Sequence, residues 1–157
     1  MNKETQQTMF SSKSTGWSTP QDFFDHLDQQ FGPFTLDPCA SSQNYKVKNY
    51  LTEEDNGLEQ SWEGHTVFMN PPYGREIKHW IKKAYEEGQK DNTTVVALIP
   101  ARTDTKYWHE YVMKADFVFF LKGRLKFGGC DNSAPFPSAI VVFRKTFHDF
   151  PRVSTME

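Results

Sequence analysis

The four residues Asn70-Pro71-Pro72-Tyr73 combine groups that suit the binding of an amino group. They directly follow the apolar residues 66–69, which are typical of a buried strand. Two successive prolines lack N–H donors and fix φ, so the strand must end there in a rigid turn. Open α/β sheets bind ligands at such strand ends. The Asn70 side-chain oxygen and the Pro71 carbonyl can accept the two hydrogens of an exocyclic amino group while Tyr73 stacks on its base.

Asp37 is a second polar group at the same predicted sheet edge. It ends a short strand at residues 34–37, and its carboxylate can accept hydrogen bonds from an amine or from ribose hydroxyls. Asn-Pro and Asp-Pro are also common in surface turns, which is the alternative for both motifs. The strand before each motif and the helix after Tyr73 favour a ligand site. Cys39 is predicted to be buried, and no histidine is placed to activate its thiol.

Two loops offer further contacts with a ligand. Residues 17–20, Trp-Ser-Thr-Pro, can present a ring and a helix N-terminus, whose N–H groups suit a carboxylate. Thr19 is expected to be the N-cap of that helix and Pro20 its first residue. Residues 55–58, Asp-Asn-Gly-Leu, can reach the same pocket, although a solvated turn fits them as well.

Three cations alternate with apolar residues after the predicted strand 116–121. Lys122, Arg124 and Lys126 would lie on one face of an extended segment whose glycines allow close approach of a ligand. This pattern suits a phosphate backbone, but alternating lysines also protect edge strands from pairing. Arg102 follows the strand 94–99 and is a further candidate contact. The histidines have no metal-ligand spacing, so no metal site is predicted.

The elements that must position these residues alternate between strands and helices. Helical spacing predicts a helix from Pro20 to Phe31, one after residue 76 that ends near Gly88, and one over residues 107–115 capped near Thr103. Strands are expected at 34–37, 66–69, 94–99, 116–121 and 139–144, with a further short one at 47–51. The pattern predicts a three-layer α/β fold whose sheet is mostly parallel, with an antiparallel pair at its end.

Length and composition agree with one domain. The 157 residues carry 18 basic and 20 acidic side chains, so net charge alone does not indicate a nucleic-acid partner. Two cysteines make no disulfide framework, which favours a reducing compartment, and no apolar run is long enough to span a membrane. We expect a flexible tail at residues 1–14, a single domain at 15–150 and a C-terminal tail at 151–157.

The motifs together resemble those of the short, phage-type Dam family of DNA N6-adenine methyltransferases. The stretches at 17–20, 36–40, 55–58, 70–73, 99–103 and 123–127 occur in the family's order and span most of the chain. The chain departs from larger methyltransferases at residues 37–40, where Asp-Pro-Cys-Ala replaces a glycine-rich turn. We expect no separate target-recognition domain within these 157 residues.

The resemblance implies a reduced Rossmann-like methyltransferase sheet and S-adenosylmethionine as methyl donor. It implies methylation of adenine N6 in double-stranded DNA, within the cytoplasm of a bacterial host cell, by a monomer or weak homodimer. The residues assigned to catalysis are Asn70, Pro71, Pro72 and Tyr73. Those assigned to the cofactor are Trp17, Thr19, Pro20, Asp37, Cys39 and Asp55. Those assigned to nucleic acid are Arg102, Lys122, Arg124 and Lys126.

Two alternatives to this function stay open from the sequence. Asn-Pro-Pro-Tyr also occurs in enzymes that methylate cytosine N4, RNA adenine or protein glutamine. A catalytically silent module that binds nucleic acid could keep the same fold. The presence of both Asn70 and Asp37 argues against a silent copy.

Overall fold

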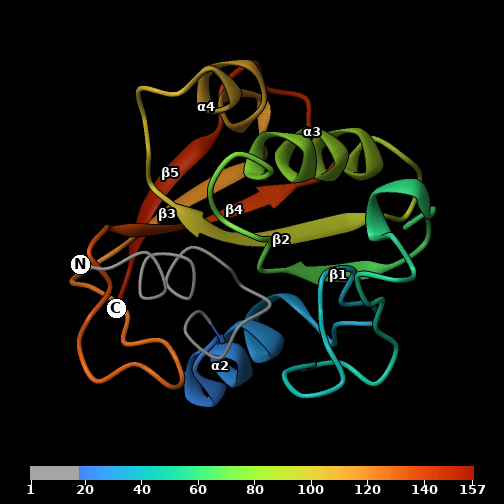
Figure 1. Cartoon of the computed structure of the whole chain (residues 1–157). Helices are drawn as coiled ribbons and strands as arrows, with labels where there is room; N and C mark the ends of the chain where they lie inside the picture. The colour runs from blue at the N-terminus through green and yellow to red at the C-terminus, as the bar shows by residue number, and fades with distance from the viewer. Residues whose placement is uncertain (1–17) are drawn as a thin grey trace.

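The structure is a computed structural model that describes residues 18–157. Its centre is a five-stranded sheet with the strand order β1-β2-β4-β3-β5 (Figure 1). The strands are β1 (Thr66–Met69), β2 (Thr94–Pro100), β3 (Phe117–Leu121), β4 (Ser138–Phe143) and β5 (Arg152–Met156). The helices are α2 (Gln21–Phe31), α3 (Ile77–Gly88) and α4 (Lys106–Glu110), with short 3-10 turns η2 (Gly57–Glu59) and η3 (Val112–Lys114).

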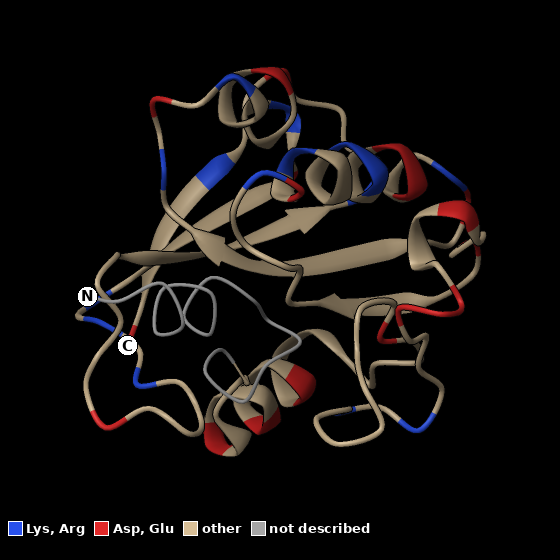
Figure 2. Ribbon diagram, viewed as in Figure 1, with Lys and Arg blue, Asp and Glu red and all other residues tan. Residues whose placement is uncertain are grey.

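Helices cover both faces of the sheet, which confirms the predicted three-layer α/β class. Figure 1 shows α3 and α4 on one face and α2 on the other. The Phe24 ring of α2 packs edge-on against Phe68 of β1, with 5.1 Å between centroids. On the opposite face, Tyr85 of α3 packs against Phe143 of β4. Figure 2 shows that charged residues lie on the helices and connections, while the central strands are almost free of them. Such strands suit a sheet that is covered by helices on both faces.

The sheet is mixed, with its parallel pairs on either side of β4. β1 is parallel to β2 and β3 is parallel to β5, whereas β4 is antiparallel to both β2 and β3. The antiparallel pairing of β3 with β4 confirms the pair predicted for the end of the chain. Single parallel bridges from Leu36 to Val67 and from Asp37 to Tyr50 add two short segments beside β1. The carboxyl ends of residues 34–37, β1, β2 and β3 therefore meet at one edge.

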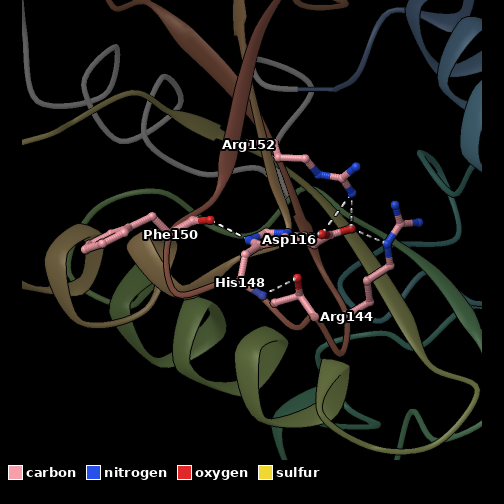
Figure 3. A network of polar contacts seen from close by, with 6 residues as sticks. Asp116, Arg144, His148, Phe150 and Arg152 are labelled. Atoms are coloured by element: carbon pink, nitrogen blue, oxygen red, sulfur yellow. Dashed lines mark hydrogen bonds and ion pairs between the residues drawn. The ribbon is translucent and has the colours of Figure 1, made fainter.

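The predicted C-terminal tail was wrong, because residues 152–156 form β5. It contains the polar residues Arg152, Ser154 and Thr155, and all of its residues but Met156 are exposed, so hydrophobic patterning gave no signal. Backbone pairing with β3 holds the strand, and Arg152 also binds Asp116 at 3.0 Å. Figure 3 shows that Arg144 and His148 bind the same carboxylate, which joins the ends of three strands.

Two helix starts differ from the sequence prediction. α2 begins at Gln21, with Pro20 in the capping position and no side-chain capping bond, so Thr19 is not its N-cap. The hydroxyl of Thr19 instead accepts a hydrogen bond from the Asn70 side chain. α4 is capped by Thr105 rather than Thr103, because the Thr105 hydroxyl accepts a hydrogen bond from the Trp108 N–H. This helix then breaks at Tyr111 and continues as η3.

Candidate active site

Asn70 lies at the carboxyl end of β1 and is held by three segments of the chain. Its side chain is buried, with 8% of the residue exposed. The Nδ2 group donates to the Thr19 hydroxyl at 3.0 Å, and Oδ1 accepts a hydrogen bond of 2.8 Å from the Tyr73 hydroxyl. The main-chain carbonyl accepts from the Cys39 thiol at 3.3 Å. The carboxamide predicted from sequence is therefore present and fixed in direction.

Tyr73 is buried in a cluster of aromatic rings rather than presented as an open surface. It is 7% exposed and meets Phe136 edge-on at 5.5 Å and Phe127 at 6.4 Å. Burial raises the pKa of its hydroxyl well above the usual range, so the hydroxyl remains a hydrogen-bond donor. Pro71 and Pro72 are buried beside it, β1 ends before them as predicted, and the chain bends and turns at residues 74–76.

A cavity of about 300 Å³ opens beside Tyr73, at the lower end of the range for ligand pockets. Its walls come from the residues after β1, the end of β2 and the loop before β4. They are Tyr73, Gly74, Ile77, Pro100, Arg102, Thr105, Tyr107 and Phe136. The Arg102 guanidinium lies 5.9 Å from the centre of the Phe136 ring. A flat aromatic ligand would fit this cavity, and of its walls the sequence had indicated only Tyr73 and Arg102.

Asp37 lies at the same edge of the sheet and is 5% exposed. Its main chain is paired with a single neighbouring segment: its N–H donates to the Asn49 carbonyl and its carbonyl accepts from the Leu51 N–H. Burial raises the pKa of the carboxyl from 3.8 to about 7, although N–H groups of Cys39 and Lys46 and the charge of Lys46 act in the opposite direction. A buried carboxylate of this kind gains stability from a cationic ligand.

A cleft of about 200 Å³ lies beside Cys39. It is lined by residues of two loops and of the start of α3: Pro38, Cys39, Ala40, Thr52, Glu53, Asn56, Gly57, Leu58, Glu76, His79 and Trp80. The loops touch at Gly57, where an added Cβ would lie 2.2 Å from the Pro38 carbonyl oxygen. Only glycine permits this contact. Three of the residues 55–58, namely Asn56, Gly57 and Leu58, line this cleft, whereas Asp37 and Asn70 border the adjoining gap.

Asp55 differs, because its carboxylate caps its own turn. It accepts hydrogen bonds from the Thr52 N–H at 2.8 Å and the Thr52 hydroxyl at 3.1 Å. Glu53 lines the cleft instead, and also a neighbouring opening of about 560 Å³ that includes Ala40 and Thr52. Glu53 was not among the site residues predicted from the sequence. Its signal was the weak strand at 47–51, whose parallel bridge to Asp37 directs the following residues to the same edge.

The remaining candidates for the cofactor lie on the segment before α2. Thr19 lies with Asp37 and Asn70 around a narrow gap between the cleft and the carboxamide, and Cys39 borders both gap and cleft. The Pro20 carbonyl begins α2 by accepting from the Phe24 N–H at 3.0 Å. Trp17 lies outside the described residues.

The basic segment, residues 122–127, is connected to the site by a backbone hydrogen bond of the residue that follows it. Lys122, Arg124 and Lys126 are exposed, whereas Phe127 is buried among the aromatic rings. The segment is irregular rather than a strand, and two contacts tie down its charges: Lys122 lies 3.5 Å from Glu157, and Arg124 donates to the Ala134 carbonyl at 3.3 Å. The Gly128 N–H donates to the Ser18 carbonyl at 2.8 Å. This bond places the segment next to Thr19.

Comparison with known proteins identifies the family. The family model described as DNA N-6-adenine-methyltransferase (Dam) matches residues 6–156. The chain belongs to this Dam family. A DNA N-6-adenine-methyltransferase of Haemophilus phage HP1 is 35% identical over 113 residues, which make up 71% of this chain and 65% of the relative. One of Escherichia phage T1 is 30% identical over 110 residues, 69% of this chain and 45% of the relative. The chain thus spans less than two thirds of either relative.

Membership of the Dam family implies a methyl donor. Within residues 18–157 no group of histidine, cysteine or acidic side chains is arranged to hold a metal ion. No helix in that part of the chain has the length and apolarity needed to cross a membrane.

Proposed function

We propose that the chain transfers a methyl group from S-adenosylmethionine to the exocyclic N6 of adenine in DNA. The observation that carries this proposal is the buried Asn70, whose side chain is bonded to Tyr73 of the aromatic cavity and whose main-chain carbonyl is bonded to Cys39 of the cleft. Family membership and the phage relatives support adenine in DNA as the acceptor.

The residues of the cleft fit S-adenosylmethionine. Bound there, it would supply a methyl group already activated on a sulfonium. The Asp37 carboxylate, which borders the narrow gap that shares Cys39 with the cleft, is disfavoured as a buried charge and would accept from the ammonium of its amino-acid part. The Glu53 carboxylate would accept from the ribose hydroxyls, and the loop at Gly57 would pack against the adenosine. Cys39 lines both the cleft and the narrow gap that Asn70 borders. It therefore connects the proposed cofactor site with the proposed acceptor site.

Asn70 and Pro71 would prepare the acceptor nitrogen. The lone pair of an adenine amino group is delocalised into the ring, so the nitrogen is a poor nucleophile. Accepting both of its hydrogens, at Asn70 Oδ1 and the Pro71 carbonyl, favours a tetrahedral nitrogen and localises the lone pair. The contribution of the protein is then positioning and electrostatics, and we assign no general base.

The aromatic cavity would receive the base after it leaves the DNA stack. Base flipping exposes a flat ring, which the cavity between Tyr107 and Phe136 can enclose while Tyr73 stacks on it. Tyr73 must first give up its bond to Asn70. Arg102 at the cavity and the cations at 122, 124 and 126 would contact phosphates of double-stranded DNA. We further propose a monomer or weak homodimer in the cytoplasm of a bacterial host.

Labelled S-adenosylmethionine offered with duplex DNA, RNA or protein tests the assignment. We expect label in duplex DNA, recovered as N6-methyladenine, and a loss of at least about 100-fold in turnover for Asn70→Ala with cofactor binding retained. Label on cytosine, RNA or protein would overturn the acceptor. Retained DNA binding without any cofactor binding would instead identify a silent module.

A further inference from the structure

Thr19 stands directly before the capping residue of a helix, yet its hydroxyl does not cap the helix. Threonines near helix starts commonly accept a hydrogen bond from a free N–H of the first turn. Here α2 has no side-chain capping bond, and the Thr19 hydroxyl accepts from Asn70 Nδ2 at 3.0 Å. Thr19 is 4% exposed, so this contact is removed from solvent. The hydroxyl therefore serves a residue 51 positions away rather than its own helix.

The backbone on both sides of Thr19 is anchored. The Ser18 carbonyl accepts from the Gly128 N–H at 2.8 Å. Pro20 has its φ fixed by the ring, at −59°, and its carbonyl begins α2. A side chain between two fixed residues has little freedom to follow a moving partner. The position of the hydroxyl thus determines where the Asn70 amide nitrogen can lie.

Two hydroxyls meet opposite ends of the Asn70 carboxamide. Thr19 binds the nitrogen, and Tyr73 donates to the oxygen at 2.8 Å. A substrate amino group that uses Oδ1 would either take the second lone pair of this oxygen or displace the Tyr73 hydroxyl. The bond to Thr19 is on the other atom and can persist throughout.

We propose that Thr19 is a positioning residue, whose hydroxyl keeps the Asn70 oxygen directed at the acceptor nitrogen once Tyr73 has moved away. The proposal rests on the proposed function, because it assigns Asn70 Oδ1 to the substrate amino group. It differs from the cofactor contact that family resemblance implies for Thr19. A cofactor contact would change cofactor affinity, whereas a positioning role changes turnover at saturating cofactor.

Thr19→Val removes the hydroxyl and keeps the shape of the side chain. We expect kcat to fall by about 10- to 100-fold, because a misdirected acceptor group costs this much. The dissociation constant for S-adenosylhomocysteine should change by less than about twofold, and Thr19→Ser should restore most of the turnover. A matched control is Thr93→Val, since Thr93 is equally buried and its hydroxyl donates to the Asp91 carbonyl at the opposite sheet edge. It should cost stability without lowering kcat.

NMR of the Asn70 side-chain amide tests the contact without any activity. In ¹⁵N spectra, Thr19→Val should shift the Asn70 NH₂ signals and speed their exchange with water, whereas Thr93→Val should leave both unchanged. Unchanged Asn70 signals in Thr19→Val would overturn the proposal. So would altered signals with full kcat, or a tenfold loss of cofactor affinity with kcat retained. Absence of adenine methylation by the wild-type protein overturns the proposed function instead, and the spectra still report whether Thr19 holds the amide.

Discussion

The Tyr73 hydroxyl donates a 2.8 Å hydrogen bond to Asn70 Oδ1, the atom assigned to the substrate amino group. A second acceptor lies nearby, because the Leu98 carbonyl is 3.4 Å from the same hydroxyl. Tyr73 can therefore leave Asn70 without losing every partner. In the absence of substrate the protein satisfies its own buried amide, and an incoming base competes with that internal bond.

Tyr73→Phe removes the internal competitor and keeps the ring. We expect kcat/KM for DNA to rise by about two- to fivefold, because one hydrogen bond no longer has to be broken. The free energy of unfolding should fall by about 1 kcal/mol for the same reason. Steady-state kinetics and thermal unfolding measure the two effects. Tyr73→Ala serves as the control that removes the ring and should lower turnover. A tenfold loss in Tyr73→Phe would show that the hydroxyl itself takes part.

Cofactor affinity should increase with pH through the titration of Asp37. Its pKa of about 7 leaves the carboxyl largely protonated at pH 6 and ionised at pH 8. Because the ionised form binds the cofactor ammonium, calorimetry should show tighter binding at pH 8 by about tenfold. Asp37→Asn should bind weakly at both values. Equal affinity of the wild-type protein at pH 6 and pH 8 would contradict this role.

The same substitution should stabilise the protein without ligand. The pKa of Asp37 is higher in the folded state than its ordinary value of 3.8, so the folded state binds the proton more tightly. Stability is then lost as pH rises from about 4 through 7. At pH 8 we expect Asp37→Asn to raise the free energy of unfolding by about 1–3 kcal/mol. Denaturant titration at pH 5 and pH 8 tests this, since the gain should shrink at pH 5.

Glu53 and Asp55 lie two residues apart but should respond differently to loss of charge. Glu53→Gln should weaken cofactor binding by about tenfold, because one charge-assisted hydrogen bond to the ribose is lost. Asp55→Asn should change cofactor affinity little and lower stability slightly, since the carboxylate accepts from the N–H and the hydroxyl of Thr52 within its own turn. Calorimetry of cofactor binding to both variants shows which of the two carboxylates contacts the cofactor. The reverse order of effects would restore Asp55 as the cofactor residue.

Lys126 should contribute to DNA binding through charge alone. Lys126→Ala should weaken binding to duplexes of any sequence and reduce the slope of log K against log salt by about one. Fluorescence anisotropy at several salt concentrations measures this slope. Lys106→Ala, on α4, is the charge-matched control and should leave the slope unchanged, because its partner is Glu110. Equal slopes in the wild-type protein and Lys126→Ala would remove Lys126 from the interface.

Asp116 should stabilise the fold without affecting chemistry. Burial alone would raise its pKa, but hydrogen bonds from Arg144, His148 and Arg152 outweigh burial and hold the pKa at about 2. The stabilisation is therefore present above pH 4 and is lost as pH falls through 2. Asp116→Asn should lower the free energy of unfolding at pH 7 by about 1–3 kcal/mol, since the three partners are partly exposed. At temperatures where the variant is folded, its kcat should equal that of the wild-type protein.

Local patterns predicted the parts of the fold that are buried. Residues 66–69 were placed correctly as β1, and residues 94–99 as β2 apart from Pro100, because continuous apolar runs suit strands covered on both faces. β5 was missed because an edge strand with four exposed residues has no such run. The start of α2 was shifted by one residue because the sequence gave Thr19 a local role.

The candidate site likewise contains residues that local patterns predict and residues that they do not. Asn70 and Asp37 were found because each ends a predicted strand. Glu53 was missed because the strand before it pairs at a single bridge. The contact between Thr19 and Asn70, and the meeting of Tyr107 with Phe136 around one cavity, depend on chain segments far apart in sequence. No local pattern encodes such contacts.

The pairing of Ser18 with Gly128 has a consequence for synthesis of the protein. A contact of such wide sequence separation carries a large loop-closure cost and forms late in folding. During translation, Thr19 and Asn70 leave the ribosome well before Gly128 can anchor the segment that holds them. The nascent chain should therefore lack the anchor that holds Thr19 beside Asn70 until residue 128 has been synthesised.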